Sequence, residues 1–336
     1  MATVSVGDRA MSSQAEAGES FKVGIARRLE RADRGFRRLT WFAAFLILVI
    51  FVGMFIALLQ GSLPALRTFG LKFFISNTWD PVGGHFGIWS MIYGTLVTSA
   101  LAMAMATPVG IGIAIFLTSL CPRPLRRPIG IAVELLAGVP SIIFGIWGLF
   151  VFAPFFQIHI EQYLIDWLGD APLVGPLFSG APFGIGIFTG SIILAIMILP
   201  LISSLCRDVF DIVPAVLKEA AYGLGCTVSE VTWRIVLPYA RGGIVGAAVL
   251  ALGRALGETM AVTFVVGNVH NASASLFAPG TTISAAIANE FSEAVEKLYS
   301  SSLLAAGLFL MFISFTVIAL ALLMLGAIAR RAGASN

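Results

Sequence analysis

Charged residues are scarce in this chain. Asp, Glu, Lys and Arg make up 12% of its 336 residues, against about 25% in an average soluble protein. Hydrophobic residues make up 58%, and the mean hydropathy is +0.94. This composition excludes a disordered chain and a basic nucleic-acid-binding surface, because both need many more charges. It favours a protein whose main solvent is lipid.

Cysteine is also rare. Cys121, Cys206 and Cys226 do not have the spacing of a metal site, so we expect neither a disulfide nor a bound metal. The sequence has no G-x-x-x-x-G-K-[ST] loop to hold nucleotide phosphates. We therefore expect no cofactor in this chain and no ATP hydrolysis by that route.

Long apolar runs account for most of the hydrophobic residues. Runs of this length satisfy their backbone hydrogen bonds in lipid as helices, rather than as the short alternating strands of a barrel. The sequence therefore predicts an all-α, multi-pass membrane protein with six transmembrane helices. The runs are 41–59, 89–118, 131–155, 183–204, 242–267 and 302–328.

Basic residues are distributed unevenly between the two sides of these runs. Eight precede the first run, three lie between the second and third, four between the fourth and fifth, and two follow the sixth. On the other side lie only Arg67, Lys72 and Lys297. The positive-inside rule therefore predicts a cytoplasmic-membrane protein with both termini in the cytoplasm.

This orientation predicts the organisation of the chain. Residues 1–40 form a cytoplasmic tail, residues 41–329 the transmembrane domain with a cytoplasmic loop at about 205–241, and residues 330–336 a second tail. The first 20 residues are small and polar, which predicts disorder. Residues 22–38 have Arg at near-helical spacing and favour a helix on anionic lipid headgroups over a specific partner site. The outer loops 60–88 and 156–182 are rich in Gly, Pro and aromatic residues and predict ordered caps.

The cytoplasmic loop carries a motif. Glu219, Ala220 and Ala221 are followed by Gly225 and then by Ile235-Val236-Leu237-Pro238. A short helix, a tight turn at Gly225 and a second helix are expected. The pattern resembles E-A-A-x3-G-x9-I-x-L-P, the signature of permease subunits of bacterial ABC importers. The resemblance implies a coupling helix that sits in a groove of an ATP-binding subunit, whose motion it passes to the spans.

Two charges lie within the fifth run. An arginine at this depth costs roughly 2.5 to 3.5 kcal/mol, so Arg254 is expected to face protein or a water-filled path. Glu258 follows at i+4, on the same face of a continuous helix. Arg254 offers a fork of donors to an oxyanion, and Glu258 would favour an oxyanion that keeps a proton, such as phosphate, over sulfate. The alternative is a structural ion pair between helices.

Gly253 and Gly257 have the spacing that lets a neighbouring helix or a substrate come close. In the third run, Pro140 is expected to kink the helix just after Glu134. Glu134 either repels an anion toward the exit or bonds a neighbouring helix. The residues leave both roles open.

The segments 254–262 and 134–145 resemble those of permeases of the phosphate-specific ABC transporter. The ending Met260-Ala261-Val262 is similar to that of the C-type subunit. The resemblance, from about residue 40 onward, implies a type I importer permease whose substrate pathway includes Arg254, Glu258 and Glu134. It also implies a second permease, two ATP-binding subunits that hold ATP and Mg²⁺, and an external phosphate-binding protein.

The sequence therefore predicts a permease subunit that moves inorganic phosphate into the cell, with ATP hydrolysed on a partner. One alternative is an importer permease for another oxyanion. Another is an ATPase-independent anion channel or carrier, against which the lack of internal repeats argues. A membrane enzyme acting on phosphate esters ranks last, because the sequence offers no nucleophile next to a general base at the membrane face.

Overall fold

A computed structural model describes residues 4–169, 171–172 and 174–333. Six helical spans in this part of the chain are long and apolar enough to cross a membrane, which confirms the predicted number. They are Gly35–Phe69, Trp89–Leu120, Ser141–Leu168, Ile187–Asp211, Val228–Leu256 and Lys297–Leu323.

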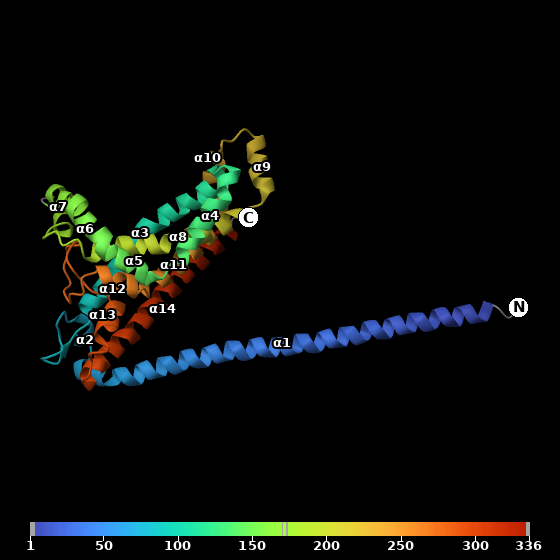
Figure 1. The fold of residues 1–336 in the computed structure, drawn as a ribbon, viewed down its shortest axis with the longest axis horizontal. Coiled ribbons are helices and arrows are strands. Elements are labelled where there is room, and N and C mark those ends of the chain that lie inside the picture. Colours follow the sequence, from blue (N-terminus) through green and yellow to red (C-terminus); the bar gives the residue numbers. More distant parts are fainter. Residues whose placement is uncertain (1–3, 170, 173, 334–336) are drawn as a thin grey trace. The chain divides into compact units, whose positions relative to one another are not determined.

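Helices dominate the secondary structure (Figure 1). Short π-helical turns at Phe116–Leu120, Gly148–Phe152, Gln157–Glu161 and Thr232–Val236 continue several α-helices, and Gly175–Leu177 is a 3-10 turn. The elements are α1 (Val4–Phe69), α2 (Lys72–Ile75), β1 (Trp79–Asp80), β2 (His85–Phe86), α3 (Trp89–Ile115), α4 (Arg123–Ala137), α5 (Ser141–Trp147), α6 (Ala153–Phe156), α7 (Gln162–Leu168), α8 (Ile187–Asp211), α9 (Ala215–Gly223), α10 (Val228–Val231), α11 (Leu237–Leu256), α12 (Met260–Val265), α13 (Ile283–Glu290) and α14 (Lys297–Gly333).

The chain divides into two compact units, Met1–Ala57 and Leu58–Asn336. The described part of the first unit is a single helical stretch of α1. Composition predicts disorder over the first 20 residues, but the helix begins at Val4. From Trp41 onward its side chains are large, apolar and exposed, as a span surrounded by lipid requires.

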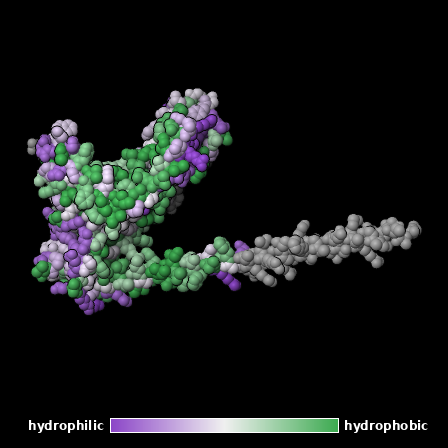
Figure 2. Space-filling view, viewed as in Figure 1, coloured by the Kyte–Doolittle hydropathy of each residue, from purple (hydrophilic) through white to green (hydrophobic). Residues whose placement is uncertain are grey.

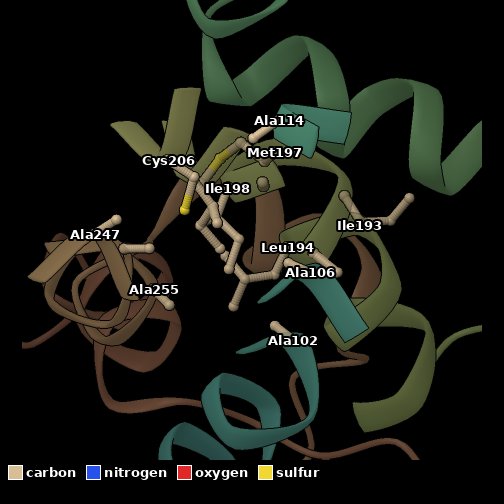
Figure 3. Close-up of a cluster of buried hydrophobic side chains, with 14 of the residues drawn as sticks. Ala102, Ala106, Ala114, Ile193, Leu194, Met197, Ile198, Cys206, Ala247 and Ala255 are labelled. Carbon is tan, nitrogen blue, oxygen red and sulfur yellow. The ribbon is translucent and has the colours of Figure 1, made fainter. Parts of the chain in front are cut away.

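The core of the second unit lies where α3, α8 and α11 pack together. Figure 3 shows small residues of α3 and α11, such as Ala102 and Ala255, around Leu194 and Ile198 of α8. Lipid is as apolar as these side chains, so close van der Waals packing rather than the hydrophobic effect holds the helices together. Gly110 of α3 belongs to this pattern, because an added Cβ would lie 2.7 Å from the Ile202 side chain.

The two ends of the second unit are polar, and the surface between them is hydrophobic (Figure 2). At the α9 end, α4 packs against α8 near the start of the α9–α10 hairpin. The opposite end carries a β-hairpin and is called the hairpin end below. There β1 pairs with β2 in antiparallel register, with Trp79 opposite Phe86 and Asp80 opposite His85. The backbone N–H groups of Val82 and Gly83 donate to Asp80 Oδ1 and close this turn. The hairpin is one of the ordered caps that the loop composition predicts, and a small exception to an all-α fold.

The third and fifth spans differ most from the predicted boundaries, and the first extends to Phe69, ten residues into the expected outer loop. The third begins at Ser141 and reaches Leu168, so its last turns occupy part of the expected loop 156–182, while residues 131–137 belong to α4. The backbone breaks at 138–140 because Pro140 has no N–H and disfavours helical backbone before it. The fifth begins at Val228 and ends at Leu256, well before Gly267.

Candidate functional site

The end of α11 contains the first candidate charge. Arg254 lies in the last turn of α11, and its side chain is exposed in the isolated chain. The helix stops at Leu256, and Gly257 is its C-cap. Residues 257–259 are not helical, and α12 begins at Met260. The expected single helix through both charges is therefore wrong, and Glu258 does not follow Arg254 on one helical face.

Glu258 is held by two hydrogen bonds, one to its side chain and one to its backbone. Its Oε1 accepts a hydrogen bond from the Ala261 N–H at 3.2 Å, which satisfies one of the free donors at the start of α12. Its backbone oxygen accepts a hydrogen bond from Ser284 Oγ at 2.7 Å. Among the described residues no ion pair joins Glu258 to Arg254. A carboxylate at a helix N-terminus is stabilised by the local dipole, so Glu258 stays in place without that pair.

The two glycines beside these charges differ in their surroundings. An added Cβ at Gly253 would lie 3.1 Å from Ile318 Cδ1, so this glycine lets α14 approach α11. A Cβ at Gly257 would meet only the chain's own backbone, at 3.7 Å or more. Space beside Gly257 is open, next to the exposed Arg254.

Glu134 lies on α4 at the α9 end. Its Oε1 accepts a hydrogen bond from Arg207 of α8 at 2.6 Å, and Arg126 donates to Asp211 at 2.9 Å. These ion pairs tie α4 to the end of α8. The contact is the one expected if Glu134 bonds a neighbouring helix.

The predicted helix, turn and helix of the loop are confirmed as α9 and α10. Gly225 has φ +87°, a backbone conformation that favours glycine. The Gly225 N–H donates to Tyr222 and the Cys226 N–H to Ala221, which together form a Schellman cap at the end of α9. A capping box between Thr227 and Glu230 begins α10. Caps on both sides of the turn make the hairpin rigid.

One face of α9 is exposed in the described chain. Glu219 and Ala220 are exposed, whereas Ala221 is 5% exposed and packs inward. Val216 and Leu224 expose 73% and 86% of their surface, and Ile212, which precedes α9, exposes 73%. An apolar patch at a polar end of a membrane protein is typical of a protein contact surface.

Composition did not reveal the hydroxyl groups that lie near the break at 257–259. Thr95, Thr98 and Ser99 of α3 lie near Glu258, together with Thr282 and Ser284 at the start of α13. Their i, i+3, i+4 spacing in α3 is a signal that the sequence offered, since it places three hydroxyls on one face of an apolar span.

The histidines are dispersed, and in the described part of the chain no group of three or more His, Cys, Asp or Glu residues could hold a metal ion. His270 Nε2 contacts Glu290, and His159 stacks on Phe155. His85 lies in β2.

Six spans, a helix broken beside an exposed arginine and a capped helical hairpin at one end define a multi-pass membrane protein with the fold of ABC importer permeases. Two solved importers share this fold. The alginate importer aligns with a TM-score of 0.55 and 18% identity, covering 86% of this chain and 96% of that one. The inward-facing MetNI methionine transporter aligns with a TM-score of 0.52 and 17% identity, covering 71% and 96%.

The chain belongs to the family described as the binding-protein-dependent transport system inner membrane component, which matches residues 106–333. Its relatives include the phosphate transport system permease protein PstC of Mesorhizobium japonicum, 58% identical over 94% of this chain and 96% of the relative. The protein of the same name from Pasteurella multocida is 52% identical over 89% and 93%. The break at 257–259 and the capped α9 are therefore features of a transport component.

Proposed function

We propose that this chain is one permease half of an ATP-driven importer that moves inorganic phosphate across the cytoplasmic membrane into the cell. The names of its relatives support phosphate as the substrate. The observation that carries the proposal is Arg254, whose guanidinium is exposed on a membrane-spanning helix. Such a charge is too costly to face lipid, so it lines a path or meets another subunit.

Phosphate suits this position. The guanidinium presents donors in a planar fork that matches two oxygens of an oxyanion. Glu258 lies within the helix break and can accept a hydrogen bond from the O–H of a partly protonated phosphate, whereas sulfate has no O–H to donate. The pair thereby favours phosphate without itself forming an ion pair.

The energy comes from a partner in this proposal. The exposed face of α9 docks on an ATP-binding subunit that holds ATP and Mg²⁺, and the rigid hairpin carries its motion into α8 and α11. A second permease completes the pathway, and a second ATP-binding subunit docks on that permease. A phosphate-binding protein delivers the substrate on the outer side.

This arrangement assigns the α9 end, the basic one, to the cytoplasm. Arg123, Arg126, Arg207 and Lys218 lie on or beside the helices at that end, and Glu290, Glu293 and Glu296 lie in or after α13 at the other. By the positive-inside rule, the proposal includes a cytoplasmic location for both termini.

Phosphate uptake by the reconstituted complex tests the substrate role. Arg254→Gln should abolish uptake while the subunits still copurify, and Arg67→Gln, which removes an exposed charge elsewhere, should transport normally. Unchanged flux in Arg254→Gln would remove the arginine from the pathway.

The coupling role needs a separate experiment. Glu219→Lys should leave the chain in the membrane but abolish ATP-driven uptake, because it reverses a charge on the exposed face of α9. Glu219→Gln, without the reversal, should retain more transport. Uptake by this chain alone, in vesicles without an ATPase, would instead favour an anion channel or carrier.

A further inference from the structure

A small polar recess lies beside the break between α11 and α12. Its volume is about 10 Å³. Helices α3, α8, α11, α12 and the start of α13 enclose it. Five hydroxyl side chains and one carboxylate line it, from Thr95, Thr98, Ser99, Thr282, Ser284 and Glu258.

Three other hydroxyls of the recess, those of Thr95, Thr282 and Ser284, already have partners within the chain. Thr95 Oγ1 donates to the Met91 carbonyl at 2.8 Å and accepts from the Ile283 N–H at 3.0 Å. Thr282 Oγ1 accepts from the Ala285 N–H at 3.2 Å. These bonds fix the start of α13 against α3.

Thr98 is different. Its residue is 1% exposed, and its Oγ1 has no hydrogen-bond partner among the described residues. A hydroxyl buried without a partner at membrane depth is costly, and such groups are rare in native proteins. Glu258, which also lines the recess, uses Oε1 to accept from the Ala261 N–H, and this leaves its carboxylate with unused acceptor capacity.

We propose that the recess binds one water molecule that bridges the Thr98 hydroxyl and the Glu258 carboxylate, which makes Thr98 a positioning residue for Glu258. A water needs about 10–15 Å³ of such volume and two or more polar partners, and the recess offers both. A tetrahedral oxyanion is too large for it. The bridge holds the carboxylate in place within the helix break, four residues after Arg254. The positioning role of Thr98 rests on the proposed function, and the water site does not.

The sign of a stability change tests the water itself. Thr98→Val keeps the shape of the side chain and removes the hydroxyl. If that hydroxyl lacked any partner, the replacement would raise the melting temperature, because it removes an unsatisfied polar group. If a water bridges it, Thr98→Val should lower the melting temperature by roughly 3 °C, and Thr98→Ser should restore it.

Ser90 supplies the matched control. It lies on the same helix, is 1% exposed and also lacks a hydrogen-bond partner among the described residues, but it does not line the recess. Ser90→Ala should therefore leave the melting temperature unchanged or raise it. A higher melting temperature in Thr98→Val, measured on the membrane-purified protein with its copurifying subunits, would overturn the water site.

Transport tests the positioning role. Thr98→Val should lower the maximal rate of phosphate uptake about tenfold, with an unchanged half-saturating concentration of loaded binding protein and with rescue by Thr98→Ser. Destabilisation with normal uptake would overturn the role of Thr98 in positioning Glu258. If the native complex moves no phosphate, the proposed function fails, and the melting comparison still decides the water site.

Discussion

His270 Nε2 lies 2.5 Å from Glu290 Oε1, at the point where the loop after α12 meets the end of α13. Trp79 of β1 and Tyr299 of α14 both donate to Glu290 Oε2 at 2.7 Å. One carboxylate thus joins four segments at the hairpin end. Its burial alone would raise its pKa, but the hydrogen bonds from His270, Tyr299 and Trp79 outweigh burial and hold the pKa of Glu290 below its usual 4.5.

Acidification should therefore destabilise the protein through Glu290. A carboxyl with a lowered native pKa stabilises the fold at neutral pH, and this contribution is lost as the pH falls from about 4.5 through the native value. Glu290→Gln should melt at a lower temperature than the native protein at neutral pH, and the difference should shrink in acid. Melting temperatures measured along a pH series check this, and a constant difference at every pH would contradict it.

The ion pair between Glu134 and Arg207 should contribute little stability. Their side chains are 52% and 23% exposed, so solvent screens the charges and the pair is worth about 1 kcal/mol or less. Glu134→Gln and Arg207→Gln should each lower the melting temperature slightly, and the double variant should lower it by less than the two losses combined. Additive losses would show that the two side chains do not act as a pair.

Gly94 should tolerate no side chain. A methyl group there would overlap the backbone carbonyl oxygen of Thr281, which cannot move aside as a flexible side chain would. Gly94→Ala should cost several kcal/mol and reduce the amount of folded protein in the membrane. Gly112→Ala, on the same helix with nothing within 4 Å, should be neutral or stabilising. Equal yields of the two variants would contradict the close contact.

The turn after α9 should depend on Gly225. Its φ of +87° makes any L side chain unfavourable, although nothing lies within 4 Å of an added Cβ. Gly225→Ala should destabilise the α9–α10 hairpin by about 1 kcal/mol and reduce ATP-driven uptake. Gly223→Ala, two residues earlier in ordinary helix, is the control and should retain both the stability of the hairpin and ATP-driven uptake. Faster amide exchange in α9 of Gly225→Ala alone would report the local loosening.

Periodicity and charge counting were enough to predict six spans and the capped helix at 215–223, because these depend on local composition and turn chemistry. They could not predict that the helix carrying Arg254 ends at Leu256. Nothing in the apolar run demands a break there. The break is stabilised by contacts distant in sequence, such as the hydrogen bond from Ser284 to the Glu258 backbone.

The same limit applies to Glu134. Its distance from Arg207 is 73 residues in sequence, and only the packing of α4 on α8 brings the two charges together. Long hydrophobic runs predict where a chain crosses the membrane, and they say little about which polar groups meet inside the bundle. Of the polar contacts at 134, 258 and 290, the one at 258 lies within the bundle, and the other two lie at its polar ends.

The bond between Trp79 and Glu290 spans 211 residues, and this has a consequence for biogenesis. A ribosome releases the β-hairpin long before α13 and α14 exist, so the hairpin waits on the membrane surface without its carboxylate acceptor. The hairpin reaches its final contacts only after the last span has been inserted. A chain stalled before that point would leave the Trp79 indole N–H without the Glu290 acceptor.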